Sequence, residues 1–455
     1  MALLTALAYL PGLGSASALP DEVVYLRVGA ALVAGDATLN AEHPPLAKLL
    51  FGLAQEVVPD PLLAVRLVAV LAGVAILVGL HLLVARATGE RHWGLAAAAA
   101  WAGLPHALRA LDQPLGGFDK LDRYGMLDPV ATAIAVLALV AAARWTDDRR
   151  LRWLVGAGAL LGLAGAAKLP GLLFAPALGL VPLLVEDRRP RTVVLRWAVL
   201  GVAVVVGFLL PFTVVFGGDA IEALVRTFSL QADHRALGHP VVIRARAYDA
   251  APWWAPWAYQ WRDDGSVLTV VLTVSAIVGV VSTRAREDLR TVLVAAVVFP
   301  AIVVAAGALV LPHYRFLWLP QTVALAVLGI RALAGRGTLG RGAATVVVGV
   351  LVVVSALTVT HTATRGSTDY RAVAELLRDL DRRPATVLVH GYPRVLLFHA
   401  PHLEVVPELP ADVVVLDPKV TGRRDIGDLE GRLRADGGYR VVEVDRLDVW
   451  IAEDR

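Results

Sequence analysis

The chain has 455 residues, of which 57% are hydrophobic and only 18% are charged. Because soluble domains carry roughly 25% charged residues, this composition excludes an ordinary soluble protein and indicates a polytopic membrane protein. The net charge of +3 does not indicate a nucleic-acid partner, since most arginines cluster in short connectors between apolar runs, where membrane topology explains them. No cysteine occurs, which excludes disulfide bonds and thiolate metal sites.

About eleven apolar stretches predict transmembrane helices. The first, residues 1–19, is uncharged but interrupted by proline and glycine, so a signal peptide cleaved near residues 16–18 is the alternative to a retained helix. The other stretches cover residues 67–85, 93–108, 129–143, 153–167, 169–185, 197–216, 266–283, 291–311, 316–330 and 342–364.

Arginines predict the orientation of these helices, because sixteen of them occupy every second connector. They are Arg86, Arg91, Arg144, Arg149, Arg150, Arg152, Arg188, Arg189, Arg191, Arg196, Arg284, Arg286, Arg290, Arg331, Arg336 and Arg341. The positive-inside rule places these connectors in the cytoplasm. Two long loops, at residues 20–60 and 217–265, and the C-terminus then lie on the extracytoplasmic side.

The first long loop and the C-terminal part have structure of their own. Helical spacing over Val23–Val33 and Leu46–Val57 predicts two amphipathic helices along the outer membrane surface. After residue 365 the composition turns soluble, with strands expected at 386–390, 412–417 and 439–444 and helices at 370–382 and 426–435. The chain is therefore predicted to combine a transmembrane domain, residues 1–365, with a small extracytoplasmic α/β domain, residues 366–455.

Polar residues gather at four places that this topology assigns to the outer face. They are the first loop with Asp21, Glu22, Tyr25, Glu42, His43 and Lys48; the run from Asp122 through Arg123 to Asp128; Lys168; and His313-Tyr314-Arg315. Each has a structural alternative, namely helix capping for the aspartates, snorkelling for the lysine and interfacial anchoring for residues 313–315. Together they offer carboxylates that can accept a proton and cations that can bind an anion such as a lipid phosphate.

These residues resemble the GT-C superfamily of polyprenyl-phosphate-sugar-dependent glycosyltransferases, near the protein O-mannosyltransferases and the aminoarabinose transferases of lipid A. The resemblance covers roughly residues 20–320 and rests on Asp21-Glu22, the Glu42-His43-Pro44-Pro45-Leu46-x-Lys48 run, the Arg123-x4-Asp128 run and Lys168. It implies a GT-C-like membrane enzyme. His43 stands where the aminoarabinose transferases have lysine, which favours a mannosyltransferase-like relative.

The resemblance also implies roles for individual residues. Asp21 matches the catalytic carboxylate, Asp128 an acidic residue beside it, and Lys168 a ligand of the donor phosphate. Further candidates for the phosphate are Arg123 and Arg315. Supporting, substrate-binding or metal-binding candidates are Glu22, Tyr25, Glu42, His43, Lys48, His234, His239 and His313, of which His234 and His239 belong to a loop, Thr227–Trp261, that resembles the family only loosely. Carboxylates and imidazoles could bind a divalent cation, but no spacing here specifies one.

The predicted activity is inverting transfer of a monosaccharide, with mannose favoured, from a polyprenyl-phosphate donor to a hydroxyl of a protein, glycan or lipid acceptor outside the cytoplasm. An alternative is a transporter or flippase with an extracellular module, although charges at helix ends and the lack of an internal repeat favour it less. A second alternative is a membrane-tethered binding module that uses strand ends of the C-terminal domain, at residues 390–392 and 417–419.

Overall fold

The computed structural model describes residues 8–453 except 106, 109–118, 238–240, 244–245, 283–284, 308–310, 365–367, 381–382, 418–428 and 446. The described residues form two compact units. The first comprises those of Met1–Pro11 and Tyr25–Thr362, and the second comprises Gly12–Val24 and Ala363–Arg455. The boundary expected after residue 365 thus lies near the division in the structure, but residues 12–24 cluster with the C-terminal residues.

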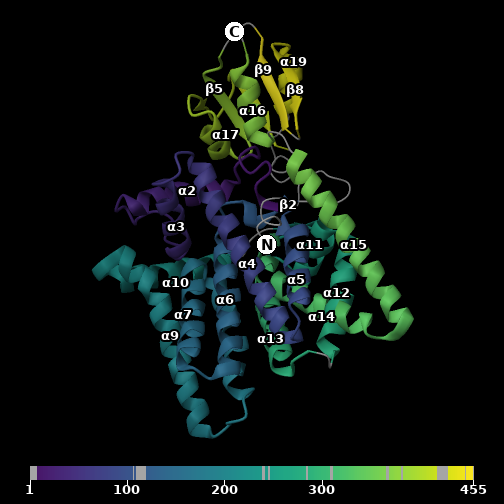
Figure 1. Ribbon diagram of the computed structural model, residues 1–455. Coiled ribbons are helices and arrows are strands. Elements are labelled where there is room, and N and C mark those ends of the chain that lie inside the picture. The colour runs from purple at the N-terminus through teal and green to yellow at the C-terminus, as the bar shows by residue number, and fades with distance from the viewer. Residues whose placement is uncertain are drawn as a thin grey trace. The chain divides into compact units, whose positions relative to one another are not determined.

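The first unit is a bundle of helices (Figure 1). Its main elements are α3 (Leu46–Gln55), α4 (Pro61–Thr88), α5 (Arg91–Gly103), α6 (Leu127–Asp148), α7 (Leu151–Ala167), α8 (Ala175–Leu180), α9 (Pro190–Phe216), α10 (Ala220–Leu237), α11 (Ala255–Asp264), α12 (Ser266–Val281), α13 (Glu287–Ala306), α14 (Leu319–Ala334) and α15 (Gly337–Thr364), and α2 (Pro20–Val33) enters it from the second unit. The 3-10 turns are η1 (Leu121–Arg123), η2 (Leu169–Phe174), η3 (Val181–Leu183), η4 (Gly217–Asp219) and η5 (Pro312–Leu317). Two short hairpins, β1 (Ala107–Leu108) with β2 (Asp119–Lys120) and β3 (Val241–Ile243) with β4 (Arg246–Tyr248), complete it.

Each apolar stretch expected between residues 67 and 364 is largely helical, which confirms the polytopic helical class. Five helices among the described residues are long and apolar enough to cross a membrane, and the bent pair α11 and α12 makes a sixth if it is one span. The helices α5, α7 and α14 are shorter than these, with 13, 17 and 16 residues, and α5 ends at Gly103, before the predicted end at residue 108. The stretch 169–185 is broken into η2, α8 and η3, each of which has proline in its first two positions.

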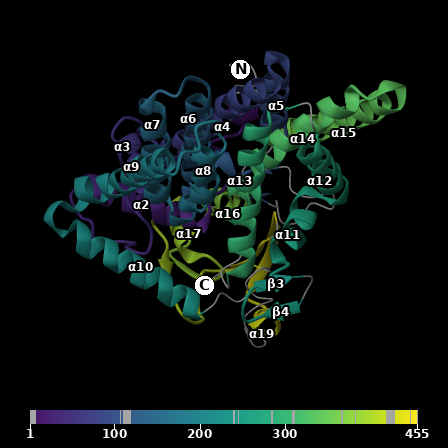
Figure 2. The ribbon, with the colours of Figure 1, turned by 90° about the horizontal axis from the view of Figure 1, so that it is seen from below.

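Small residues bring the helices of the bundle together. A Cβ atom on Gly162 of α7 would lie 2.1 Å from the carbonyl oxygen of Val204 in α9, and one on Gly279 of α12 would lie 1.9 Å from that of Leu325 in α14. Only glycine permits such close backbones, as is typical of helix packing in membranes. Between these two pairs, α13 packs against α14 on one side and against η2 and α8 on the other (Figure 2).

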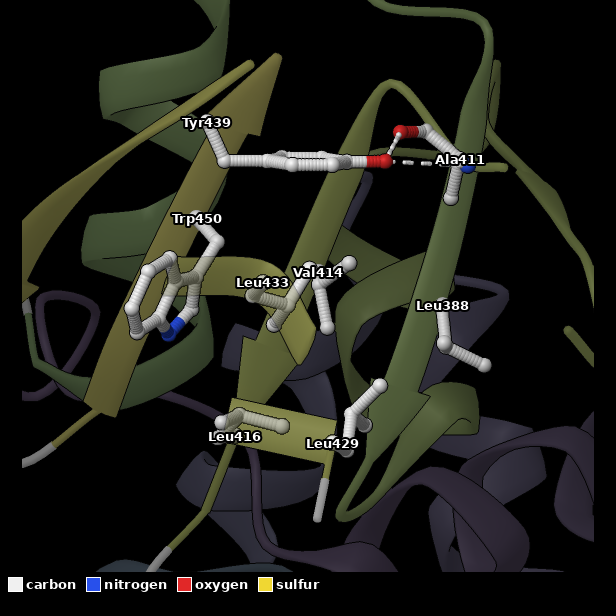
Figure 3. Close-up of a cluster of buried hydrophobic side chains, with 8 residues drawn as sticks. All are labelled: Leu388, Ala411, Val414, Leu416, Leu429, Leu433, Tyr439 and Trp450. Carbon is white, nitrogen blue, oxygen red and sulfur yellow. Dashed lines mark hydrogen bonds between the residues drawn. The ribbon is translucent and has the colours of Figure 1, made fainter. Parts of the chain in front are cut away.

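The second unit contains a five-stranded mixed sheet with the order β6-β5-β7-β9-β8. The strands are β5 (Thr386–His390), β6 (Glu404–Val405), β7 (Val413–Leu416), β8 (Tyr439–Val444) and β9 (Leu447–Ala452), and the helices are α16 (Asp369–Arg378), α17 (Pro393–His399) and α19 (Leu429–Asp436). β5 pairs in parallel with β6 and β7, whereas β9 is antiparallel to β7 and β8. Its core packs Trp450 and Tyr439 against leucines of α19, and the Tyr439 hydroxyl donates to the carbonyl of Ala411 at 2.8 Å (Figure 3). The predicted small α/β fold is confirmed.

Candidate functional site

A buried ion pair between Asp128 and Lys168 lies at one end of the helix pair α6 and α7. The Lys168 Nζ is 2.8 Å from both carboxylate oxygens of Asp128, and the two side chains are 4% and 1% exposed. A two-residue connector joins α6 to α7, so the helices run antiparallel and the first turn of α6 lies beside the end of α7. Asp128 is in that first turn, and Lys168 directly follows Ala167, the last residue of α7.

This geometry replaces the structural alternatives weighed for both residues. Lys168 does not snorkel, because its ammonium is buried against a carboxylate. Asp128 is not the N-cap of α6, since that position belongs to Met126. The pair is therefore a buried polar site in an apolar surrounding, where one charge without the other would be costly.

Residues 313–315, in η5, lie close to this pair. The Lys168 Nζ lies 4.6 Å from the centroid of the Tyr314 ring, a cation–π contact. A charge on the His313 ring would interact with the Asp128 carboxylate. Arg315 is buried, with 3% of its surface exposed.

A second buried polar cluster includes residues that the sequence analysis did not single out as candidates. The Tyr9 hydroxyl donates to Asp122 Oδ2 at 2.7 Å, and the Lys120 Nζ lies 4.6 Å from the Tyr9 ring. Lys120 also donates to the carbonyls of Trp101 and Ala102, at 3.1 and 2.8 Å, and so caps the end of α5. The signal that could have found this cluster is an ionisable residue next to apolar helices, which is rare unless it is paired.

Arg123, a candidate for the donor phosphate, belongs to this neighbourhood. It follows Asp122 in η1 and its guanidinium donates to the carbonyl of Pro11. Together with the Tyr9–Asp122 bond, this contact joins residues 9–11 to the segment that leads into α6. In the structure Arg123 therefore connects two parts of the chain, and phosphate binding by it stays a prediction.

The first loop forms a network around Lys48 of α3. Its ammonium donates to the carbonyls of Asn40 and His43, each at 2.7 Å, and the Asn40 amide donates to Glu42 Oε1 at 2.8 Å. The ring of His43 makes an edge contact with that of Tyr25, with centroids 5.8 Å apart. Burial lowers the pKa of Lys48 to about 7, although the Glu42 carboxylate opposes this change.

The same loop is bound by α10 of the second long loop. The Thr227 hydroxyl donates to the carbonyl of Ala41, and the Gln231 amide donates to that of Glu42, both at 2.7 Å. The helices α2 (Pro20–Val33) and α3 (Leu46–Gln55) form where the two amphipathic helices were expected. The two long loops are thus joined by direct hydrogen bonds.

Asp21 and Glu22 occupy the first turn of α2, within the second unit. Glu22 is fully buried and its Oε2 accepts from the backbone N–H of Leu19 at 3.1 Å, the contact by which a glutamate at the third helical position caps a helix. Asp21 is exposed and follows Pro20 inside the helix, so it is not the N-cap. Glu22 stabilises the helix start, while Asp21 is an exposed residue of the same turn.

Two histidine candidates cannot be assigned a contact. His239 lies outside the described residues, and the side chain of His234 does as well, although its backbone belongs to α10. Within the described part of the chain, no three His, Cys, Asp or Glu side chains come together as a metal site.

Comparisons with known proteins agree with this architecture. Residues 42–215 match the family described as dolichyl-phosphate-mannose-protein mannosyltransferase. Curated protein sequences gave no match. The fold is similar to that of ArnT from Cupriavidus metallidurans bound to undecaprenyl phosphate, with a TM-score of 0.61 and 14% identity over 99% of this chain and 96% of that one.

Two further solved structures share the fold. The apo state of the same ArnT gives a TM-score of 0.56 at 14% identity, over 99% of this chain and 95% of that one. The archaeal oligosaccharyltransferase AglB from Archaeoglobus fulgidus, in complex with an inhibitory peptide and a dolichol-phosphate, gives 0.51 at 10% identity, over 92% of this chain and 68% of that one.

The chain shares the fold of the ArnT and AglB structures, and its described part contains helices that are long and apolar enough to cross a membrane. The family match over residues 42–215 and the shared fold agree with the resemblance drawn from the sequence. The segment that matches the mannosyltransferase family includes Glu42, His43, Lys48, Asp128 and Lys168. Asp21, Arg315 and the second unit lie outside it.

Proposed function

We propose that this protein transfers a monosaccharide from a polyprenyl-phosphate donor to a hydroxyl acceptor on the extracytoplasmic side of the membrane, with inversion at the anomeric carbon. The similar ArnT and AglB structures contain a polyprenyl phosphate, which supports this donor class. The matched mannosyltransferase family supports mannose as the sugar. The arginine-rich connectors support the sidedness, since they favour the cytoplasm.

The observation that carries the proposal is the buried pair of Asp128 and Lys168. Burying two opposite charges is a poor way to stabilise a protein, because their desolvation offsets most of their attraction. An ammonium has three N–H donors, so it can donate to a phosphate oxygen while it remains paired with a carboxylate. The pair is therefore suited to stabilise a phosphate group on which negative charge develops during a reaction.

In the proposed reaction the acceptor oxygen attacks the anomeric carbon and Asp21 takes the proton from the acceptor hydroxyl. The bond between the anomeric carbon and the phosphate oxygen breaks, and the polyprenyl phosphate leaves as an anion. Lys168 stabilises the charge that develops on the phosphate, and Asp128 fixes the position of Lys168. No acid is needed, because the leaving phosphate is stable without a proton.

The remaining candidates have supporting roles in this proposal. Arg315 and Arg123 are further cations for the phosphate, and His313 lies next to Tyr314, which contacts Lys168. Glu42, His43 and Tyr25 belong to the loop network that covers α3. A divalent cation, bound by acidic and histidine side chains, is a further proposal that a chelator can test.

The test is sugar transfer by the purified chain in detergent, with polyprenyl-phosphate donors that differ only in the sugar. We expect Asp21→Asn to lower kcat by roughly 10²–10⁴-fold, the usual contribution of a general base. The matched control is Asp36→Asn, which changes another exposed carboxylate of the first loop. Full activity of Asp21→Asn would contradict the assignment of Asp21 as the base. A product with the same anomeric configuration as the donor would exclude inversion.

A further inference from the structure

The segment that precedes Asp21 is bound to the C-terminal domain. Residues 12–24 belong to the same compact unit as residues 363–455, although more than 300 residues separate them in sequence. Ser17 and Ala18 are 6% and 4% exposed. Backbone N–H groups in so buried a segment need partners, because an unpaired one is costly.

Those partners come from side chains of the C-terminal domain. The N–H of Ser17 donates to the hydroxyl of Thr368 and the N–H of Ala18 donates to Nε2 of His399, both at 3.2 Å. On the carbonyl side, the Arg371 guanidinium donates to the oxygen of Gly14. Three side chains thus bind the main chain of residues 14–18.

The three side chains are themselves well placed by the domain. Thr368 is the N-cap residue of α16 but makes no capping bond with its own side chain. Arg371 lies in the first turn of α16 and pairs with Glu375 one turn later, at 3.2 Å. His399 ends α17, and α16 packs against α17.

The contacts end just before the helix that carries Asp21. Ala18 is followed by Leu19, whose N–H is capped by Glu22, and α2 starts at Pro20. Only two residues, Leu19 and Pro20, lie between Ala18 and the proposed base, and they are restricted by a helix cap and a proline ring. A shift of the segment 14–18 would therefore move the Asp21 carboxylate with it.

We propose that the C-terminal domain positions the catalytic carboxylate, with Thr368, His399 and Arg371 as positioning residues that act through the backbone of residues 14–18. The proposal rests on the assignment of Asp21 as the base in the proposed function. The domain is then part of the catalytic apparatus and not an accessory module, because it holds the segment that leads into the helix of the base.

The experiment removes two acceptors without adding bulk or charge. Thr368→Val and His399→Phe, singly and together, leave the N–H groups of Ser17 and Ala18 without these partners. Thr368→Ser and His399→Gln keep an acceptor at nearly the same place. Arg394→Ala, an exposed change on the same helix as His399, is the matched control.

Hydrogen exchange of the peptide that covers residues 12–20 is measured first, because it needs no substrate. We expect the double variant to exchange about tenfold or more faster in this peptide, since a buried donor loses its partner. The Ser, Gln and Arg394→Ala variants should exchange like the wild type. Unchanged protection in the double variant would overturn the proposal.

Transfer kinetics then separate positioning from simple stability. We expect the double variant to lose about tenfold or more in kcat with a nearly unchanged donor KM, and the Ser and Gln variants to recover most of it. Faster exchange with unchanged kcat would also overturn the proposal, because the segment would be loose without consequence. If the wild type transfers no sugar from any donor, the proposed function fails while the exchange result still stands.

Discussion

The two ends of α6 carry carboxylates in opposite surroundings. Asp128, in the first turn, is fully buried and pairs with one lysine through both of its oxygens. Asp147, in the last turn, is 30% exposed and pairs with Arg86 and Arg286. At 1.5 Å per residue the two acids lie about 28 Å apart, which is nearly the thickness of the hydrocarbon core.

This difference supports the proposal that the exposed pairs at Asp147 are structural and that the buried pair of Asp128 and Lys168 takes part in the reaction. The Asp147 pairs link the ends of α4 and α6 to the start of α13 and use arginines that also mark the predicted cytoplasmic side. Such exposed pairs require little desolvation and contribute little to the free energy of unfolding. The Asp128–Lys168 pair loses the hydration of two charges when it is buried, and this cost offsets most of the attraction between them.

The strongest test of this difference is to remove one partner of the buried pair. We expect Lys168→Met to lower the free energy of unfolding by about 3–5 kcal/mol, because it leaves a buried carboxylate without its cation. Transfer activity should be lost as well. Thermal unfolding in detergent measures the first effect, and the transfer assay measures the second.

The double variant Asp128→Asn with Lys168→Met separates the two roles of the pair. Without either charge, most of the lost stability should return, since the desolvation cost has disappeared together with the attraction. Activity should stay absent. A double variant that regains both stability and activity would show that the pair has only a structural role. The two ends of α6 would then not differ in function.

Lys48 is a second buried cation at the same end. Leu46, at the start of its helix, packs against the apolar cluster that contains Ala166, two residues before Lys168. Its pKa of about 7 in the folded protein lies below the ordinary lysine value of 10.5. Between these pH values the unfolded chain binds a proton that the folded protein does not, so the free energy of unfolding should rise with pH. The rise should be on the order of 2 kcal/mol over two pH units.

Melting curves in detergent at several pH values between 7 and 9 measure this slope. Lys48→Met should flatten it, whereas Arg226→Met, which removes an exposed charge from the neighbouring α10, should leave it unchanged. Equal slopes for the wild type and Lys48→Met would show that Lys48 keeps its proton in the folded protein. The carbonyls of Asn40 and His43 would then outweigh the cost of burial.

Much of the architecture follows from local patterns. Apolar length predicts the helices from α4 to α9 and from α12 to α15, whereas α10 and α11 lie in the loop 217–265 and were not predicted. The strands at 386–390 and 439–444 have the expected bounds. The pairing of Asp128 with Lys168 also follows from the chain, once α6 and α7 are recognised as a hairpin with a two-residue connector. Residues at the start of one helix and the end of the next must then be neighbours.

Other parts of the site depend on contacts that no local pattern announces. Thr368 and His399 bind backbone N–H groups more than 350 residues away, and a backbone N–H has no sequence signature. Lys120 looks like an ordinary charge in a connector, yet it caps α5 through main-chain carbonyls. The predicted helix 93–108 extends past Gly103, where α5 ends, because hydropathy continues beyond the last helical residue.

The smallest expected effect is that of removing Asp147, at the exposed end of α6. Asp147→Asn removes the carboxylate shared by Arg86 and Arg286, but Arg286 retains Asp288, and the pairs are partly open to solvent. We expect a loss of about 1 kcal/mol or less in the free energy of unfolding, smaller still at high salt, and unchanged kcat and donor KM. Melting temperatures at 0.05 and 0.5 M salt with the transfer assay measure both. A loss as large as that of Lys168→Met would mean that the exposed Asp147 cluster contributes as much to stability as the buried pair does, which contradicts the prediction.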